Sequence, residues 1–169
     1  MEDRRIASLK GSIREELEGG LLPFWTRQTD EERGGFRGWV SRDLRVRGDA
    51  PKGLILNTRL LWTFSAAYLF TREEEYRRLA RRAHDYLSRF FRDREFGGGF
   101  WLVDAEGRPL DEKKKIYGQA FYIYGLAEYY RASEDEAVLG EALALFRLLI
   151  EKAWDGDKGG FLESFNRDW

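Results

Sequence analysis

The chain has 169 residues, of which 29 are Lys or Arg and 30 are Asp or Glu, so its formal net charge is −1. This length suits one hydrophobic core, and the balanced charge gives no positive field to attract nucleic acid. The absence of cysteine excludes disulfides and Cys-ligated zinc, while no apolar run reaches the roughly 20 residues of a membrane span. We therefore expect a cytoplasmic protein whose partners include neither nucleic acid nor a membrane.

The first predicted element is a helix over residues 6–17, where Ile6, Leu9, Ile13 and Leu17 recur at helical spacing. Next comes a short alternating segment after Phe36, which predicts a half-buried strand. Residues 54–70 then form an apolar run that contains one charge, Arg59. Such a run is typical of a helix that is buried on nearly all sides.

Helices of two kinds alternate in the rest of the chain. Residues 76–91 and 139–150 each have one apolar face and one charged face, which predicts outer helices with a solvated side. Residues 116–127 contain no charge and predict a second inner helix. Between them, Asp104 to Pro109 supplies the turn of a β-hairpin.

A tripeptide, Gly-Gly-Phe, occurs three times, with its phenylalanine at Phe36, Phe100 and Phe161. An aspartate stands six or seven positions before each phenylalanine, at Asp30, Asp93 and Asp155. We expect the glycines to adopt positive φ and the aspartates to form turns, with no role in catalysis.

The order of these elements predicts an all-α fold with short β-hairpins between helix pairs. Helices of one class all run in the same direction, so the hairpins and the N-terminal ends of the inner helices gather at one end. Stacked helical hairpins of this kind form an α/α toroid or a solenoid. Arg59, Tyr117 and Gln119 lie near the starts of inner helices and so at the end where the hairpins gather.

Four segments carry a family resemblance: LILNTRLLWTFSAAY, FGGGFWLVDAEGRP, KIYGQAFYIYGLAEYYRAS and GGFLESFNRDW. Together they resemble the N-acylglucosamine 2-epimerase family, most closely its cellobiose (mannobiose) 2-epimerase branch, from about Leu22 to Trp169. The resemblance implies a barrel of six helical hairpins that epimerises C2 of a reducing sugar, with no cofactor. Six units of roughly 60 residues need about 360 to 400 residues. Residues 1–169 are therefore expected to form one partial, N-terminal domain, about 40% of such a barrel.

The resemblance also implies a site. Arg59 would point into the sugar cleft and stabilise the negative charge of the enediolate. Tyr117 would donate a hydrogen bond to a sugar hydroxyl, and Phe121 would form part of the wall. The other predicted substrate-binding residues are Asn57, Trp101 and Trp169. We expect no metal, because no His or carboxylate cluster has ligand spacing.

Each of these residues also has a structural interpretation, and the segment from Tyr117 to Tyr130, which includes Phe121, is of a kind that is more often core than site. Arg59 could form an ion pair with a hairpin carboxylate, and Asn57 could bond backbone near the start of its helix. The hairpin tryptophans, Trp39 included, could simply cover the inner helices. Three further tyrosines are predicted to serve packing: Tyr122, Tyr124 and Tyr129.

The acid/base groups are the main departure from the family. Epimerisation needs two such groups that flank C2, and the family uses a histidine pair, whereas this chain has only His84. We expect His84 to be a structural or surface residue and the isolated chain to be inactive.

Two alternatives stay open. One is a non-catalytic helical module that binds carbohydrate or protein. The other is a toroid glycoside hydrolase or lyase that uses Glu163 and Asp168. Because an unfinished ring exposes an inner-helix flank, we also expect self-association through that flank.

Overall fold

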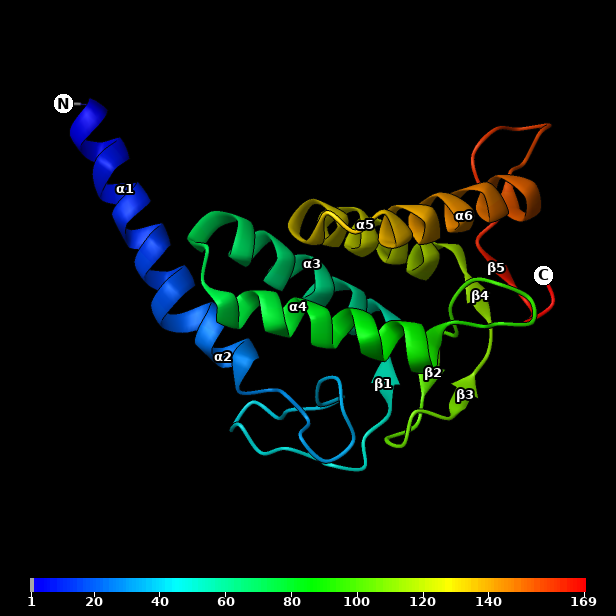
Figure 1. The fold of residues 1–169 in the computed structure, drawn as a ribbon, viewed down its shortest axis with the longest axis horizontal. Coiled ribbons are helices and arrows are strands. Elements are labelled where there is room, and N and C mark those ends of the chain that lie inside the picture. The colour runs from blue at the N-terminus through cyan, green and yellow to red at the C-terminus, as the bar shows by residue number, and fades with distance from the viewer. Residues whose placement is uncertain (1) are drawn as a thin grey trace.

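The computed structural model describes residues 2–169 (Figure 1). Its helices, two of them single π-helical turns, are α1 Glu2–Glu16, η1 Leu17–Leu21, α2 Leu22–Thr26, α3 Leu54–Thr71, α4 Glu74–Tyr86, η2 Leu87–Phe91, α5 Ile116–Ser133 and α6 Glu136–Ala153. The strands are β1 Lys52–Gly53, β2 Leu102–Val103, β3 Pro109–Asp111, β4 Lys114–Lys115 and β5 Ser164–Phe165. Within this described part, no helix has the length and apolar character needed to cross a bilayer.

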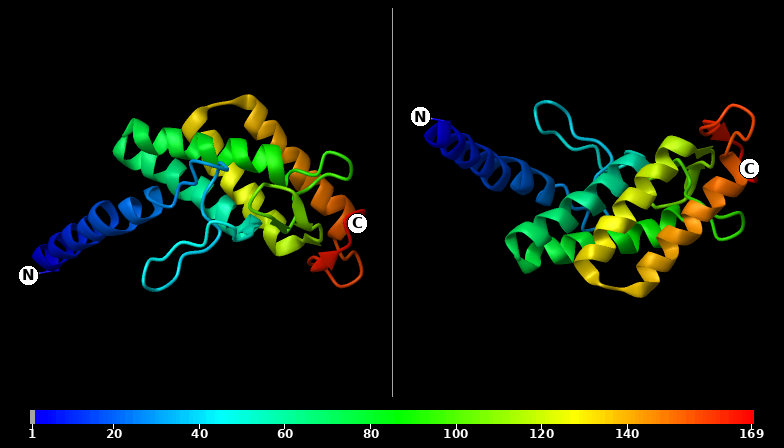
Figure 2. Two further views of the ribbon diagram at one scale, coloured as in Figure 1. Left: turned by 90° about the horizontal axis from the view of Figure 1, so that it is seen from below. Right: turned by 90° about the horizontal axis from the view of Figure 1, so that it is seen from above.

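The helices form two layers, as the alternating patterns predict. α3 and α5 pack side by side, α4 packs on α3, and α6 packs on α5 (Figures 1 and 2). The core lies between the layers, where Leu61, Phe64, Ala83 and Leu126 are at most 2% exposed. The inner and outer assignments are therefore confirmed, although each helix extends beyond its predicted range.

The strands gather where α3 and α5 begin (Figure 1). β1, β2 and β3 form an antiparallel sheet in that order, and β4 pairs with β5. The hairpin turn at Asp104 to Pro109 is confirmed by the pairing of β2 with β3. The strand expected after Phe36 is reduced to isolated bridges, such as Val40 with Val46.

Two predicted apolar faces are only partly covered by the described residues. On α1, which projects from the two layers (Figure 2), Ile6, Leu9 and Ile13 are 47%, 61% and 58% exposed. On α6, Ala142 and Leu149 are buried as predicted, whereas three other members of the predicted stripe are exposed: Leu143, Phe146 and Ile150. The reason is the same in both cases, since the described neighbours cover only the base of α1 and one side of α6.

The three glycine loops, residues 30–36, 93–99 and 155–161, share one hydrogen-bond pattern. This pattern corrects the predicted alignment of the Gly-Gly-Phe repeat. The Gly34 amide donates to the Asp30 carbonyl, and the same bond joins Gly97 to Asp93 and Gly159 to Asp155. The middle loop is therefore aligned through Gly97-Gly98, one residue earlier than the tripeptide implies. Gly99 takes the place of a phenylalanine because its Cβ would lie only 3.2 Å from Tyr122 and 3.3 Å from Leu54.

Two buried lysines are a feature that the sequence analysis missed. Lys52 Nζ lies 2.8 Å from Asp30 Oδ2, and Lys114 Nζ lies 2.8 Å from Asp93 Oδ2. The other oxygen of each aspartate accepts turn amides, as predicted: Asp30 Oδ1, for example, accepts from the Arg33 amide at 3.1 Å. Each lysine stands two residues before an inner helix, so the pair fixes the start of that helix to the preceding loop.

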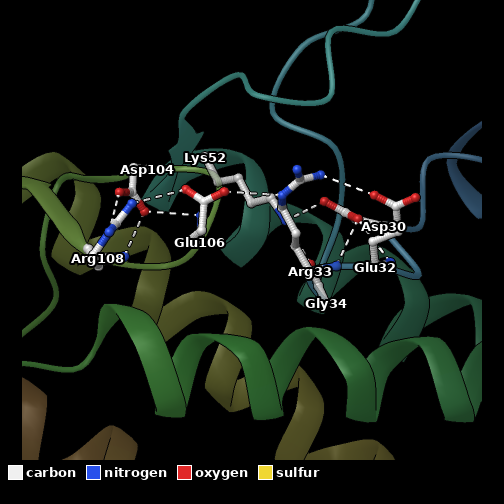
Figure 3. Close-up of polar contacts among 8 residues, drawn as sticks. All are labelled: Asp30, Glu32, Arg33, Gly34, Lys52, Asp104, Glu106 and Arg108. Carbon is white, nitrogen blue, oxygen red and sulfur yellow. Dashed lines mark hydrogen bonds and ion pairs between the residues drawn. The ribbon is translucent and has the colours of Figure 1, made fainter.

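The first of these pairs belongs to a larger polar network (Figure 3). Lys52 Nζ also donates to the Gly34 carbonyl at 2.7 Å. From the same loop, Arg33 Nε donates to Glu106 Oε1 at 3.3 Å, which ties the loop to the β2–β3 turn. Burial raises the pKa of Asp30, but the hydrogen bonds from Lys52 and the Arg33 backbone outweigh it, so the net pKa is lowered.

Candidate active site

The inner helices leave one face uncovered. On α5 the exposed positions recur three or four residues apart, at Tyr117, Ala120, Tyr124, Ala127 and Arg131. On α3, Arg59 is exposed between buried Thr58 and Leu60. The outer helices pack on the opposite side of this layer, so the exposed face is a surface shared by α3 and α5 alone.

Arg59 is held on this face by an aromatic ring. Its guanidinium carbon lies 4.8 Å from the centre of the Phe121 ring, a distance at which a cation is attracted to the ring face. None of the carboxylates in residues 4–169 lies within ion-pair distance of it, so the predicted alternative of a structural ion pair is not found among them. The charge of Arg59 therefore remains available to a ligand on this face.

Aromatic rings continue from Phe121 in both directions. The Tyr117 ring meets it edge-on with centres 5.0 Å apart, and the Tyr124 ring does so at 6.1 Å. Tyr124 in turn stacks on Trp62 of α3 at 5.2 Å. Tyr117 and Tyr124 are 52% and 47% exposed, so the cluster presents ring faces and two hydroxyls to solvent.

The tyrosines predicted to serve packing divide into two groups. Tyr122 and Tyr129 are buried, as predicted. Tyr124 packs on Trp62 but is also part of the exposed face. Trp62 was not among the predicted site residues, although its position three residues after Arg59 on an inner helix could have indicated it.

Asn57 lies beneath the exposed face and is fully buried. Its Nδ2 donates to the Gly53 carbonyl at 2.9 Å, which is the backbone bond that the sequence analysis gave as the alternative. Gln119 occupies the corresponding position of α5 and exchanges two hydrogen bonds with the backbone of Gly99, at 2.7 and 2.8 Å. The Asn57 amide thus ties the start of α3 to β1, and the Gln119 amide ties α5 to the glycine loop that precedes β2.

The structure does not bring the two predicted hairpin tryptophans into the Arg59 cluster. Trp101 packs near Gly118, and Lys115 Nζ lies 4.2 Å from its ring centre. Trp169 packs against Phe165 and donates its indole N–H to the Phe96 carbonyl at 3.0 Å. These contacts match the covering role that was the alternative for hairpin aromatics.

The exposed face therefore offers a fixed cation, ring surfaces and phenolic hydroxyls, which suit a polar, ring-shaped ligand that develops negative charge. The one histidine of the chain is not on this face. His84 belongs to α4 and faces α6, with Nε2 3.6 Å from Glu141 Oε2 and its ring stacked on Tyr129 of α5. The part of the chain that the structure describes also holds no cluster of three or more His, Cys, Asp or Glu side chains that could bind a metal.

Comparison with known proteins identifies the family. The model of the N-acylglucosamine 2-epimerase (GlcNAc 2-epimerase) family matches residues 34–169. The chain belongs to this family. The resemblance carried by the four segments is thus confirmed.

Relatives within the N-acylglucosamine 2-epimerase family are sugar epimerases and isomerases. The chain is 44% identical to a cellobiose 2-epimerase of Bacteroides fragilis over 162 residues, which cover 95% of this chain and 41% of that enzyme. It is 30% identical to a D-mannose isomerase of Marinomonas mediterranea over 139 residues, which cover 82% of this chain and 34% of that protein. The chain therefore spans about two fifths of the length of these cellobiose 2-epimerase relatives.

Solved structures from the family establish the fold. The structure of cellobiose 2-epimerase from Bacillus thermoamylovorans superimposes with a TM-score of 0.94 at 39% identity, covering 96% of this chain and 42% of that one. A family 76 glycoside hydrolase of Bacteroides thetaiotaomicron shares only the fold, at 18% identity and a TM-score of 0.71. The two helical layers are accordingly part of an α/α toroid, as predicted.

Proposed function

We propose that this chain is part of a carbohydrate 2-epimerase that acts through an enediolate on a reducing sugar, such as cellobiose or an N-acyl aminosugar. The observation that carries the proposal is Arg59, an exposed cation without a carboxylate partner in residues 4–169, held over Phe121 on the uncovered inner face. Family membership and the names of the relatives support the same chemistry.

In the proposed mechanism, a base removes the C2 proton of the open-chain sugar, and the electron pair moves onto the carbonyl oxygen. Arg59 stabilises that oxyanion, a role for which one fixed donor contributes about 3–4 kcal/mol in a water-excluded site. Phe121 keeps the guanidinium in place, and the Tyr117 hydroxyl donates a hydrogen bond to the sugar. Return of a proton to the opposite face of C2 completes the inversion.

We propose that the acid/base groups of this mechanism come from outside this chain, whose one histidine, His84 of α4, faces Glu141 of α6. The 169-residue chain by itself is therefore expected to be inactive. Incubation with cellobiose in deuterium oxide tests this, and no deuterium should enter C2. Incorporation above the buffer rate would show that the chain carries its own proton-transfer groups.

Sugar binding to the exposed face is tested separately by saturation-transfer NMR with cellobiose. Arg59→Met should abolish the transfer, since methionine keeps the contact with Phe121 but removes the charge. Arg131→Met is the matched control, because Arg131 lies at the far end of the same α5 face and already pairs with Glu128 at 2.7 Å. Equal transfer in all three proteins would contradict the role proposed for Arg59.

A further inference from the structure

In an α/α toroid the next helical pair packs on the exposed side of α6 and the third glycine loop, and we propose that Asp155, on this surface, receives the buried ammonium of a lysine from that pair. The occupant is the part of a family enzyme that follows the segment matched by this chain. This inference concerns assembly of the ring and is independent of the sugar chemistry.

In each of the first two glycine loops, the aspartate pairs with a lysine that comes later in the chain. Asp30 is paired with Lys52, 22 residues later, and Asp93 with Lys114, 21 residues later. In each case the lysine is at most 1% exposed and stands two residues before an inner helix. Each loop is thus completed by the module that follows it in the chain.

The second step is that the third loop has the same internal geometry. Asp155 Oδ1 accepts from the Asp157 and Lys158 amides at 3.1 Å each, just as Asp30 and Asp93 accept from their own turns. The Asp155 amide donates to the Gly160 carbonyl at 3.0 Å. Within residues 2–169, however, no ammonium or guanidinium lies within 4.0 Å of the Asp155 carboxylate.

The third step concerns the glycines of the loops. A Cβ at Gly35 would lie 2.6 Å from Tyr86 at the end of α4, and a Cβ at Gly97 would lie 2.8 Å from Leu148 of α6. The outer helix of the following module therefore covers each of the first two loops. Around Gly159 and Gly160, no atom of the described chain lies within 4 Å of such a Cβ.

An exposed apolar surface lies on α6 and beside the third glycine loop. Leu143, Phe146 and Ile150 of α6 are 42%, 49% and 42% exposed, and Trp154 and Phe161 beside the loop are 50% and 45% exposed. A helix preceded by a lysine could pair the lysine ammonium with the Asp155 carboxylate and cover this surface with its apolar side chains. By the spacing of the repeat, a module continuing the chain would bring its lysine to position 176 or 177.

The proposal is tested by co-expression of the tagged 169-residue chain with the part of the Bacteroides fragilis enzyme that follows the matched segment. We expect the two polypeptides to co-purify. Asp155→Asn should weaken the complex by about 30-fold or more, because a buried lysine loses its counter-charge. This variant keeps Oδ1 for the turn amides, and an unchanged circular dichroism spectrum checks its fold.

Asp157→Asn is the matched control, since it removes the same charge two residues away on an exposed side chain, and it should leave the affinity unchanged. Three results would overturn the proposal: no co-purification with the unaltered chain, equal affinity for Asp155→Asn, or pairing of two copies of this chain that Asp155→Asn does not affect. Because the readout is complex formation, it is separate from sugar binding at Arg59.

Discussion

Lys114 illustrates how a charge is kept inside this fold. Its side chain is fully buried, with Asp93 at 2.8 Å and the face of the Phe100 ring at 4.8 Å. Arg167 also reaches Asp93, with Nε 3.0 Å from Oδ2. Replacing both members of a buried ion pair by apolar residues usually changes the free energy of unfolding little. Removing only one member lowers it strongly, because the other charge stays buried without a partner. The pair therefore fixes which loop and which helix belong together.

Asp93→Asn should lower the free energy of unfolding by about 3–5 kcal/mol, because it leaves the Lys114 ammonium buried without a counter-charge. Asp155→Asn is the matched control, since it makes the same change in the same turn where the structure shows no ion pair. It should change stability by less than about 0.5 kcal/mol. Urea unfolding of both variants measures the difference, and equal midpoints would argue against the role of Lys114.

The same aspartates predict a loss of stability in acid. Burial raises the pKa of Asp93, but hydrogen bonds from Arg167 and Lys114 lower it well below its ordinary value, and the pKa of Asp30 is also lowered. A carboxyl whose pKa is lowered by folding stabilises the protein above its unfolded pKa of about 3.9, and this contribution is lost as pH falls.

Urea midpoints should therefore fall steadily below about pH 5. The double variant Asp93→Asn, Lys114→Met should show a shallower decline between pH 7 and pH 3, because one of the two pairs is gone. Parallel curves for the two proteins would mean that other carboxyls dominate the acid response.

The sequence indicated these residues only in part. The aspartates were interpreted as turn formers, which their Oδ1 contacts confirm. Their lysine partners were missed because a lysine beside a helix start is usually solvated. The repeated interval from Asp to Lys, together with the position of each Lys two residues before an apolar helix, was the signal that could have revealed them.

At the scale of elements, the contact between α3 and α5 depends on glycine. A Cβ at Gly125 would lie 2.8 Å from the Thr58 carbonyl oxygen, which belongs to the backbone of the neighbouring helix. The two inner helices therefore approach as closely as they do only because this position has no side chain.

Gly125→Ala should destabilise the protein by about 1–3 kcal/mol through overpacking, even though alanine favours helix by about 1 kcal/mol. Gly140→Ala in α6 has no atom within 4 Å of the new Cβ and should instead stabilise by about 0.5–1 kcal/mol. Thermal unfolding of the pair is the measurement. The same sign of change for both would contradict the close approach of α3 and α5.

Periodicity predicted the helices well and the strands poorly, for a physical reason. An apolar run such as residues 54–70 or a one-sided stripe such as residues 76–91 specifies a helix by its own pattern. Strands of two or three residues have no such pattern and depend on partners distant in sequence, as with β4 and β5. The exposure of the α1 stripe could not be predicted either, because an apolar stripe does not say which element covers it.

Across the whole molecule, local stability should be uneven. α3 and α5 are packed on several sides, whereas α1 projects away and exposes Ile6, Leu9 and Ile13 (Figure 1). Segments with few buried contacts open with free energies near zero, while core helices open only on global unfolding.

Native-state hydrogen exchange should accordingly find fast exchange over residues 4–13 and the slowest exchange in the middle of α3 and α5. The lower part of the first helix, where Arg14 lies over the Phe70 ring at 5.2 Å, should be intermediate. Uniform protection along α1 would mean that another surface covers it in solution.

The reach of each lysine back to an earlier loop has a consequence for synthesis on the ribosome. The first loop cannot close until Lys52 has been translated, and its glycines stay uncovered until Tyr86 arrives, 51 residues after Gly35. At about 5–20 residues per second, that interval lasts roughly 3–10 seconds. A nascent ring of this design would mature one unit behind its growing end, so the unit made last would still lack the lysine and the outer helix that complete its loop.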